Sequence, residues 1–318
     1  MLNDPRVSAC IVIYHSGQEV LQTIRCVRDS QEPVTLFVVD NAPGDGTARS
    51  IQRQYPSVPV IAMERHEGYG RANNRVLSLM KSVYHIVLNP DITFEPDLVG
   101  RMVAWMDEHP DVVILTPRVL NPDGTEQFLP KMRPTIRFLT LGRLDAAGEK
   151  VLRKAEAVGR FAAEAERVSR AAWEQHDAEK RGLTDLMRCN RLNGRMTRLK
   201  RREKRLRGLA GWLKHWRAAY TLADNPPTEP TEVQFATGCF LLIRSHAFYK
   251  LKGFDERFFL YQEDSDLTMS ARRLGKVVYH PDMCVTHAWH RDSSRSFLGL
   301  WRHVRSTWIF FRKWGWKW

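Results

Sequence analysis

Two short acidic stretches carry side chains that could act on a nucleotide diphosphate. The first, Asn89-Pro90-Asp91, follows an apolar run, and the second, Glu263-Asp264-Ser265-Asp266, begins a run with helical spacing. A loop carboxylate such as Asp91 can bind Mg²⁺ or Mn²⁺, which then bridges the phosphate oxygens of a nucleotide. Crowded carboxylates raise at least one pKa by mutual repulsion. One of the later acids could therefore accept the proton of an attacking hydroxyl group.

Each stretch also has a simpler interpretation. An Asn-Pro-Asp sequence commonly turns the chain out of a strand, and acids in the first turn of a helix stabilise it through the helix dipole. The apolar residues 258–261 precede the second stretch and would bury it against the core, which weakens the helix-capping interpretation. Taken one at a time, both stretches remain open to either interpretation.

A glycine-containing stretch and a histidine pair offer further ligands. Gly68 and Gly70 would let the backbone approach a ligand closely, and Arg71 could meet a phosphate. The same pattern is also typical of a helix start, and its spacing is neither a dinucleotide fingerprint nor a Walker loop. His287 and His290 stand near basic and hydroxyl residues, where an imidazole could bind a metal or be purely structural.

The elements that would position these residues alternate between strands and helices over residues 5–120. Apolar runs predict strands at 7–14, 35–40, 58–63, 85–88 and 112–116, with helices at 18–28, 68–82 and 97–109 and one after 47. This rhythm predicts a mostly parallel sheet with helices on both faces. Ligands bind at the carboxyl ends of such strands, where Tyr14, Asp40, Glu64 and the first acidic stretch lie.

Residues 140–222 interrupt this rhythm with helical, basic sequence. Apolar residues at 192, 196, 199, 206, 210 and 213 predict one or two long amphipathic helices, with a break near Asn193-Gly194. Strand and helix patterns resume at 235–244 and 264–274, and a Trp-rich basic helix covers 296–318. We therefore expect one half of an α/β domain at 1–139, a helical insertion and linker at 140–230, the other half at 231–295, and an amphipathic helix at 296–318.

The positive charge is concentrated in the insertion. The chain of 318 residues carries a net charge of +13, and residues 143–217 hold 21 Lys/Arg against 10 Asp/Glu. A local basic patch indicates an anionic partner. Helices that interleave aromatic and basic residues favour an anionic membrane surface. A solvated hairpin or a coil that forms a homo-oligomer is the alternative, and no recognised motif supports a nucleic-acid partner.

Cysteine usage and hydropathy indicate a cytoplasmic protein. The five cysteines are scattered and odd in number, which is unlike a disulfide framework or a zinc site. The first residues lack the pattern of a secretory signal. No apolar run approaches the length of about 20 residues that a spanning helix needs. We expect a cytoplasmic protein, peripheral on the cytoplasmic face of the inner membrane.

Together these motifs resemble family 2 glycosyltransferases, which have the GT-A fold, and in particular the rhamnosyltransferase-like group that builds bacterial lipopolysaccharide O-antigen and related polysaccharides. The resemblance covers roughly residues 5–135 and 232–315. The matching segments are 7–14, 38–41, 68–74, 88–91, 236–244, 253–259, 263–267, His287 and 302–306.

The resemblance implies a role for each matching residue. Asp264 would be the general base, supported by Glu263, while Asp91 and His287 would hold Mg²⁺ or Mn²⁺. Many relatives have Asp-x-Asp where this chain has Asn89-Pro90-Asp91, so the neutral Asn89 would be the weaker ligand. The residues expected to bind the nucleotide-sugar are Tyr14, Asp40, Asn41, Gly68, Arg71, Asn73 and Asn89.

The expected reaction is an inverting glycosyl transfer. The donor would be dTDP-L-rhamnose by resemblance, although the residues do not separate a dTDP-sugar from a UDP-sugar. The acceptor would be a hydroxyl group of a lipid-linked saccharide. A non-catalytic membrane scaffold with a similar fold is the alternative from another class.

Overall fold

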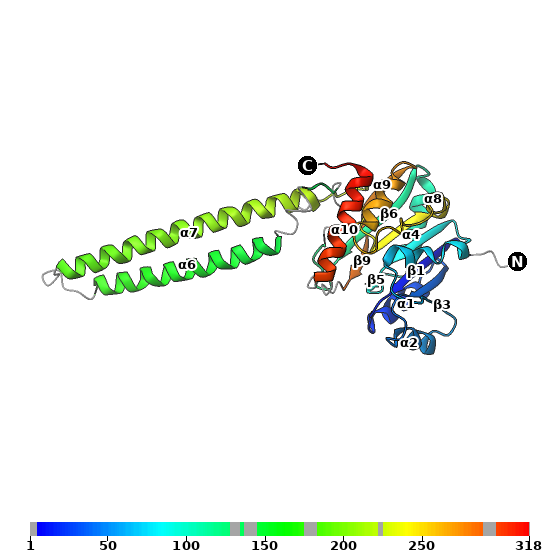
Figure 1. Cartoon of the computed structure of the whole chain (residues 1–318), viewed down its shortest axis with the longest axis horizontal. Helices are drawn as coiled ribbons and strands as arrows, with labels where there is room; N and C mark the ends of the chain where they lie inside the picture. The colour runs from blue at the N-terminus through cyan, green and yellow to red at the C-terminus, as the bar shows by residue number, and fades with distance from the viewer. Residues whose placement is uncertain are drawn as a thin grey trace. The chain divides into compact units, whose positions relative to one another are not determined.

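A computed structural model describes residues 5–127, 134–136, 145–174, 183–221, 225–288 and 297–317. The chain forms two compact units, of which the first joins Met1–Pro134 to Asn225–Trp318 and the second is Thr135–Asp224. The first unit holds all the strands of the described chain and every predicted site residue. Figure 1 shows its sheet and the helices around it.

The first unit is built on a nine-stranded mixed sheet with the order β3-β2-β1-β4-β8-β6-β9-β5, with β7 paired to β9. Strands β1, β2, β3 and β4 run parallel, and β8 lies antiparallel between β4 and β6. The strands are β1 (Val7–Ile13), β2 (Val34–Asp40), β3 (Val60–Ala62), β4 (Tyr84–Leu88), β5 (Ile92–Thr93), β6 (Val112–Leu120), β7 (Thr231–Glu232), β8 (Phe240–Arg244) and β9 (Lys276–His287).

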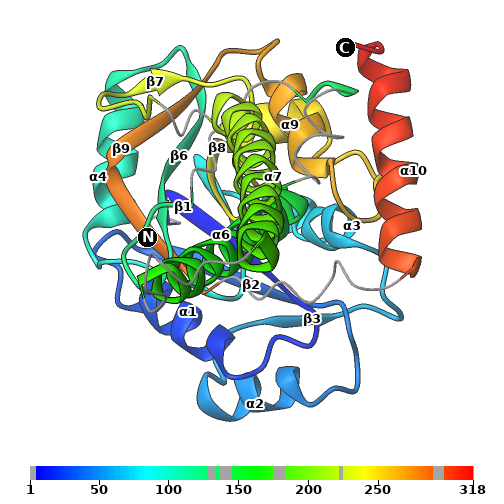
Figure 2. The ribbon, with the colours of Figure 1, turned by 90° about the vertical axis from the view of Figure 1, so that its left-hand side faces the viewer.

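Helices cover both faces of the sheet, as the sequence predicts. The helices of this unit are α1 (Glu19–Arg28), α2 (Thr47–Gln54), α3 (Tyr69–Asn74), α4 (Leu98–Glu108), α8 (Ser245–Leu251), α9 (Glu263–Ala271) and α10 (Phe297–Trp314), with a 3₁₀ turn at Leu77–Leu79. The stretch 68–82, predicted as one helix, is therefore a short helix followed by a 3₁₀ turn. In the view of Figure 2, α4 and α10 lie on opposite sides of the strands.

The core consists of two apolar layers, one on each face of the sheet. In β1 every residue is buried, with Ala9 and Ile11 packed in one layer and Cys10 and Val12 in the other. Side chains alternate between the two faces of a strand, so a central strand must be apolar throughout. This explains the continuous apolar runs that predict β1 and β4.

The second unit is an antiparallel pair of long helices, α6 (Asp145–Glu174) and α7 (Leu183–Thr221). The predicted break at Asn193-Gly194 is wrong, since α7 continues through both residues. A glycine costs a helix about 1 kcal/mol, which packing along the partner helix can offset. Contacts between the helices include an ion pair from Lys200 to Glu166 at 2.8 Å.

Candidate active site

The structure brings the two acidic stretches to either side of one short segment, Gly238-Cys239. The Cys239 carbonyl accepts a hydrogen bond of 2.9 Å from the Asn89 N–H. The Gly238 N–H donates to Asp264 Oδ2 at 3.2 Å. A Cβ at Gly238 would stand 3.2 Å from the Asp264 Cβ, so glycine permits this close approach. Two stretches separated by more than 170 residues therefore share one site.

Asp264 and Glu263 begin α9 but neither caps it. The N-cap position is taken by Gln262, which follows Tyr261, and both residues have a positive φ. Such backbone is uncommon for residues other than glycine and collects at functional sites. Glu263, Asp264 and Asp266 nevertheless lie in the first turn of α9, where acids stabilise a helix through its dipole, so the simpler interpretation of this stretch also fits the structure.

The two acids have different surroundings. Glu263 is 7% exposed, and burial followed by the charge of Asp264 raises its pKa from 4.5 to about 8. Its Oε2 atom has no hydrogen-bond partner among the described residues. Asp264 is only partly buried, and the Ser265 N–H donates to its Oδ1 at 2.7 Å. A partly exposed, backbone-oriented carboxylate suits a proton acceptor, whereas burial favours the protonated form of its neighbour.

The first acidic stretch faces a histidine across a short strand pair. Strand β5 pairs with the end of β9 so that Ile92 lies opposite His287. This register places His287 Nε2 3.3 Å from Asp91 Oδ1 and 3.3 Å from Asn89 Nδ2. The Thr23 hydroxyl donates to the Pro90 carbonyl at 2.8 Å and fixes the loop from the other side.

Gln127, which the sequence analysis missed, sets the tautomer of His287. The Gln127 Nε2 amide donates to the His287 carbonyl at 2.8 Å and to Asn121 Oδ1 at 2.9 Å, which fixes the direction of the amide. Its Oε1 then accepts from His287 Nδ1 at 3.0 Å. The lone pair of His287 Nε2 therefore points toward the Asp91 carboxylate. No sequence motif marks Gln127, because this contact depends on tertiary structure.

This pair fits a divalent cation. Two acceptor atoms at 3.3 Å repel one another unless a cation or a proton lies between them. Neighbouring ligands of an octahedral ion with bonds of about 2.1 Å stand about 3 Å apart. The described residues contain no group of three or more His, Cys, Asp or Glu side chains that could hold a metal. Asp91 and His287 alone would leave most coordination positions to phosphate oxygens and water.

The predicted nucleotide residues surround the carboxyl ends of β1 and β2. Tyr14 is 47% exposed and stacks on His66 with ring centroids 4.1 Å apart. Asp40 is buried, which raises its pKa, and it accepts a hydrogen bond from the Ala42 N–H at 3.0 Å. Glu64 is exposed. Tyr14, which follows β1, and Asp40, at the end of β2, thus place an exposed aromatic ring and a buried carboxylate at this edge of the sheet.

Three of the predicted nucleotide residues hold the backbone. The Asn41 amide donates to the Gly68 carbonyl at 3.2 Å and accepts from the Glu67 N–H at 3.0 Å. Gly68 has φ 93°, and a Cβ there would stand 2.1 Å from the Phe259 carbonyl oxygen, so only glycine fits. Asn73 is fully buried and bonds the Tyr69 carbonyl. These contacts position the loop that leads into α3.

Arg71 lies away from the Asp91–His287 pair, in a separate cavity beside α10. His290, suggested above as a second metal ligand, lies outside the described residues.

Asp266, which the sequence analysis left without a role, is 2% exposed and binds Lys313 Nζ at 2.8 Å and Trp314 Nε1 at 2.7 Å. Helix α10 thereby supplies partners for a buried carboxylate two residues after Asp264.

The family model described as Glycosyl transferase family 2 matches residues 8–166, which is half of the chain. The chain belongs to glycosyl transferase family 2. Membership in this family confirms the resemblance inferred from the motifs and makes the protein a glycosyltransferase.

Two relatives in the family are rhamnosyltransferases. The chain is 25% identical over 297 residues to N-acetylglucosaminyl-diphospho-decaprenol L-rhamnosyltransferase of Mycobacterium tuberculosis, covering 88% of this chain and 75% of that protein. It is 32% identical over 85 residues to rhamnosyltransferase WbbL of Escherichia coli, covering 26% of this chain and 32% of that protein.

Solved glycosyltransferases share the fold. The crystal structure of GalNAc-T7 with UDP, GalNAc and Mn²⁺ superposes with a TM-score of 0.55 at 14% identity, covering 97% of this chain and 48% of that one. This likeness confirms the GT-A fold class that the resemblance implied. In the part of the chain that the structure describes, no helix is both long and apolar enough to cross a membrane.

Proposed function

We propose that this family 2 glycosyltransferase transfers L-rhamnose from dTDP-L-rhamnose to a hydroxyl group of a lipid-linked saccharide acceptor, with inversion at the anomeric carbon. The observation that carries the proposal is the placement of Asp264 and of the Asp91–His287 pair on either side of Gly238-Cys239. The names of the two relatives support rhamnose as the sugar and, for the mycobacterial protein, a diphosphate-linked lipid acceptor.

In this mechanism Asp264 accepts the proton of the acceptor hydroxyl as its oxygen attacks the anomeric carbon. The hydrogen bonds from the N–H groups of Gly238 and Ser265 hold the carboxylate in place. Glu263, buried and neutral, adds no second negative charge near the attacking oxygen. Tyr14 and Asp40 would contact the base and ribose, and Asn41 and Gly68 would hold the loop beside them.

Asp91 and His287 would hold the divalent ion, Mg²⁺ or Mn²⁺, which when bound supplies positive charge to the leaving diphosphate. Without the ion the Asn89 amide can donate to the lone pair of His287 Nε2 at 3.3 Å, and a bound ion would replace this hydrogen bond. The Mn²⁺ in the GalNAc-T7 structure supports this assignment by fold likeness alone.

The test is a panel of nucleotide-sugars, each with and without Mn²⁺, screened by thermal shift and then by transfer to a prenyl-diphosphate saccharide with product detection by mass spectrometry. A true donor stabilises the folded state by linkage. We expect dTDP-L-rhamnose to give the largest shift and to support transfer. Transfer from a UDP-hexose alone would show that the donor is a UDP-sugar and not dTDP-L-rhamnose. Stabilisation without any transfer would favour the non-catalytic scaffold.

We further propose that α10 lies on an anionic membrane surface, which suits a lipid-linked acceptor and a peripheral protein on the cytoplasmic face of the inner membrane. Trp301 and Trp308, both about half exposed, lie on this helix. The helix has several basic residues and no acidic ones. Exposed aromatic and basic side chains together favour the interface of an anionic bilayer.

Vesicle flotation tests this surface. The protein should float with vesicles that contain phosphatidylglycerol, less so at high salt, and the double variant Trp301→Ser/Trp308→Ser should float poorly. Val83→Ser, which removes an apolar side chain of similar exposure elsewhere, is the matched control. Equal flotation of the double variant and the control would show that these α10 side chains do not form the membrane contact.

A further inference from the structure

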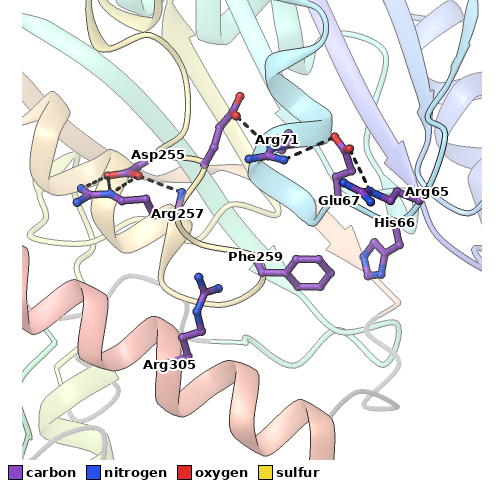
Figure 3. Close-up of a pocket in the computed structure, with 9 residues that line it drawn as sticks. Arg65, His66, Glu67, Arg71, Asp255, Arg257, Phe259 and Arg305 are labelled. Carbon is purple, nitrogen blue, oxygen red and sulfur yellow. Dashed lines mark hydrogen bonds and ion pairs between the residues drawn. The ribbon is translucent and has the colours of Figure 1, made fainter.

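A cavity of about 640 Å³ lies beside α10, apart from the Asp91–His287 pair. Its walls come from the segment before α3, α3 itself, the loop after α8 and one side chain of α10. The lining residues are Arg65, His66, Glu67, Arg71, Asp255, Glu256, Arg257, Phe259 and Arg305. Figure 3 shows Arg305 rising from α10 toward the loop that carries Arg257 and Phe259.

Three of its four arginines are paired with the acids of the cavity. Glu67 Oε1 lies 3.6 Å from Arg65 Nε, Arg71 Nε lies 3.0 Å from Glu256 Oε2, and Arg257 pairs with Asp255. Asp255 is also bound by Lys313, and these two partners lower the pKa of its carboxyl group. All three acids of the cavity therefore already have a cationic partner.

Arg305 is the arginine without a partner. No hydrogen bond, ion pair or ring contact of its guanidinium occurs among the described residues. An arginine presents five donors in a planar fork, which matches the oxygens of a phosphate. Arg305 thus brings an uncompensated positive charge and free donors to the wall of the cavity.

Arg71 has unused donor capacity as well. Its buried Nε atom has no partner of good hydrogen-bond geometry in the described part of the chain, although Glu256 Oε2 lies 3.0 Å away. Buried donors without an acceptor are uncommon in proteins, and an absent ion or water is one explanation. The cavity therefore contains two arginines from different elements whose N–H groups lack acceptors.

The surroundings of Arg305 on α10 are apolar and exposed. Trp301 lies four residues before Arg305 and Trp308 three residues after it, so both are its neighbours on the helix surface. Val304 is the residue directly before Arg305. The exposed fractions of Trp301, Val304 and Trp308 are 56%, 55% and 49%. A ligand that met Arg305 with an anionic head would meet these side chains with an apolar tail.

We propose that this cavity binds the diphosphate of the lipid-linked acceptor, held by Arg305 and Arg71, with the prenyl chain leaving along Trp301 and Trp308. The site deepens the proposed function and rests on it for the identity of the acceptor. The loop that forms one wall continues from Phe259 into Glu263-Asp264, so a saccharide attached to a diphosphate held here can extend toward the catalytic base. The donor diphosphate would be bound separately, by Asp91 and His287.

The proposal is tested with farnesyl diphosphate, farnesyl monophosphate, farnesol and inorganic pyrophosphate, each titrated into the full chain by calorimetry without vesicles or nucleotide. Farnesyl diphosphate should bind at least about tenfold more tightly than the monophosphate, because it offers more charged acceptors to the arginines. Arg305→Gln should weaken its binding by about tenfold or more, and Arg305→Lys should weaken it less, since lysine keeps the charge and loses the fork.

Arg312→Gln is the matched control. Arg312 lies on the same helix over the ring of Trp308 but does not line the cavity, and its loss removes the same amount of charge. It should change the affinity for farnesyl diphosphate less than twofold. Equal effects of Arg305→Gln and Arg312→Gln, or equal binding of farnesol and farnesyl diphosphate, would overturn the proposal. So would displacement of farnesyl diphosphate by dTDP, which would make the cavity a nucleotide site.

The transfer assay separates this site from the function. If transfer from dTDP-L-rhamnose occurs and Arg305→Gln leaves the acceptor KM unchanged, the cavity assignment is wrong while the function stands. If farnesyl diphosphate binds through Arg305 but no rhamnose is transferred, the site stands and the proposed reaction is wrong. In a correct assignment Arg305→Gln raises the acceptor KM and leaves the donor KM unchanged.

Discussion

Asp264 and Glu263 are adjacent residues whose different burial gives them different chemistry. Asp264 is partly exposed and oriented by two backbone N–H groups, whereas Glu263 is enclosed by protein and its Oε2 atom finds no partner among the residues that the structure describes. A proton acceptor must reach its substrate, so accessibility decides between two residues of similar type. The sequence supplies the pair of acids, and the roles that we propose for them rest on the difference in burial that the fold creates.

Replacement of the proposed base should remove turnover and keep binding. Asp264→Asn keeps the size of the side chain and one of its two backbone hydrogen bonds, but the amide cannot accept the hydroxyl proton. We expect turnover to fall by on the order of 10²–10⁴, with the thermal shift by the donor unchanged. Asp282→Asn, at an exposed position in β9, is the control. Turnover near that of the wild type would reject the assignment.

Glu263 should make stability depend on pH. Its pKa is raised from 4.5 to about 8 in the folded state, so the folded protein keeps a proton that the unfolded chain loses. Its contribution to stability is therefore fully present below pH 4.5 and is lost as the pH rises toward 8. Glu263→Gln stays neutral, so its melting temperature should match that of the wild type near pH 5 and exceed it by several degrees near pH 8. Parallel melting curves across this range would show that Glu263 is ionised in the folded state.

Metal binding should depend on the nucleotide. Asp91 and His287 provide two ligands, and Mg²⁺ and Mn²⁺ usually need six. We expect Mn²⁺ alone to leave the melting temperature unchanged, and Mn²⁺ with dTDP to raise it more than dTDP does alone. Asp91→Asn should abolish the extra shift. A large shift from Mn²⁺ alone would indicate a preformed site with further ligands.

At the scale of elements, α10 contacts α9, the helix that carries the proposed base. Lys313 and Trp314 in its last turn bind the buried carboxylate of Asp266 in α9. Burial raises the pKa of Asp266, while Lys313 opposes that change, so loss of the lysine would leave a buried acid without its cation. This contact makes the amphipathic helix part of the catalytic unit.

Lys313→Met should therefore destabilise the protein. Removing one partner of a buried, hydrogen-bonded charge costs about 1–3 kcal/mol, measured as the free energy of unfolding in urea. Lys317→Met, which removes an exposed lysine just beyond the helix, should cost little. The pair Asp266→Asn/Lys313→Met should recover part of the loss, because no buried carboxylate remains. An equal loss in both single lysine variants would show that general charge, rather than the Asp266 contact, is responsible.

Local patterns predicted most elements, and tertiary contacts decided the rest. The apolar runs of β1 and β4 and the periodicity of α6 and α7 follow from burial, which the sequence records directly. The continuity of α7 through Asn193-Gly194 depends on its partner helix. Likewise, the contacts of Gln127 with His287 and of Trp314 with Asp266 join residues far apart in the chain, so no local pattern could predict them.

At the scale of the whole molecule, the insertion and the catalytic unit are separate bodies. The α6–α7 hairpin carries most of the net charge, and it exposes Phe161, Leu209 and Trp212. Replacing residues 137–222 by a Gly-Ser linker should leave donor binding in the thermal-shift assay intact, because every proposed donor contact lies in the first unit. Flotation with anionic vesicles should become less sensitive to salt. Loss of donor binding in a folded deletion variant would show that the hairpin takes part in the active site.

The position of β8 has a consequence for how the chain can be divided. This strand comes after the insertion, yet it pairs with β4 and β6, which both come before it. A cut between α6 and α7 would leave an N-terminal fragment with a gap in its sheet and a C-terminal fragment that holds the missing strand. Because unpaired strand edges seek partners, the fragments should reassociate without a covalent link. Separately produced halves of this glycosyltransferase should therefore restore an intact sheet, and with it activity, when they are mixed.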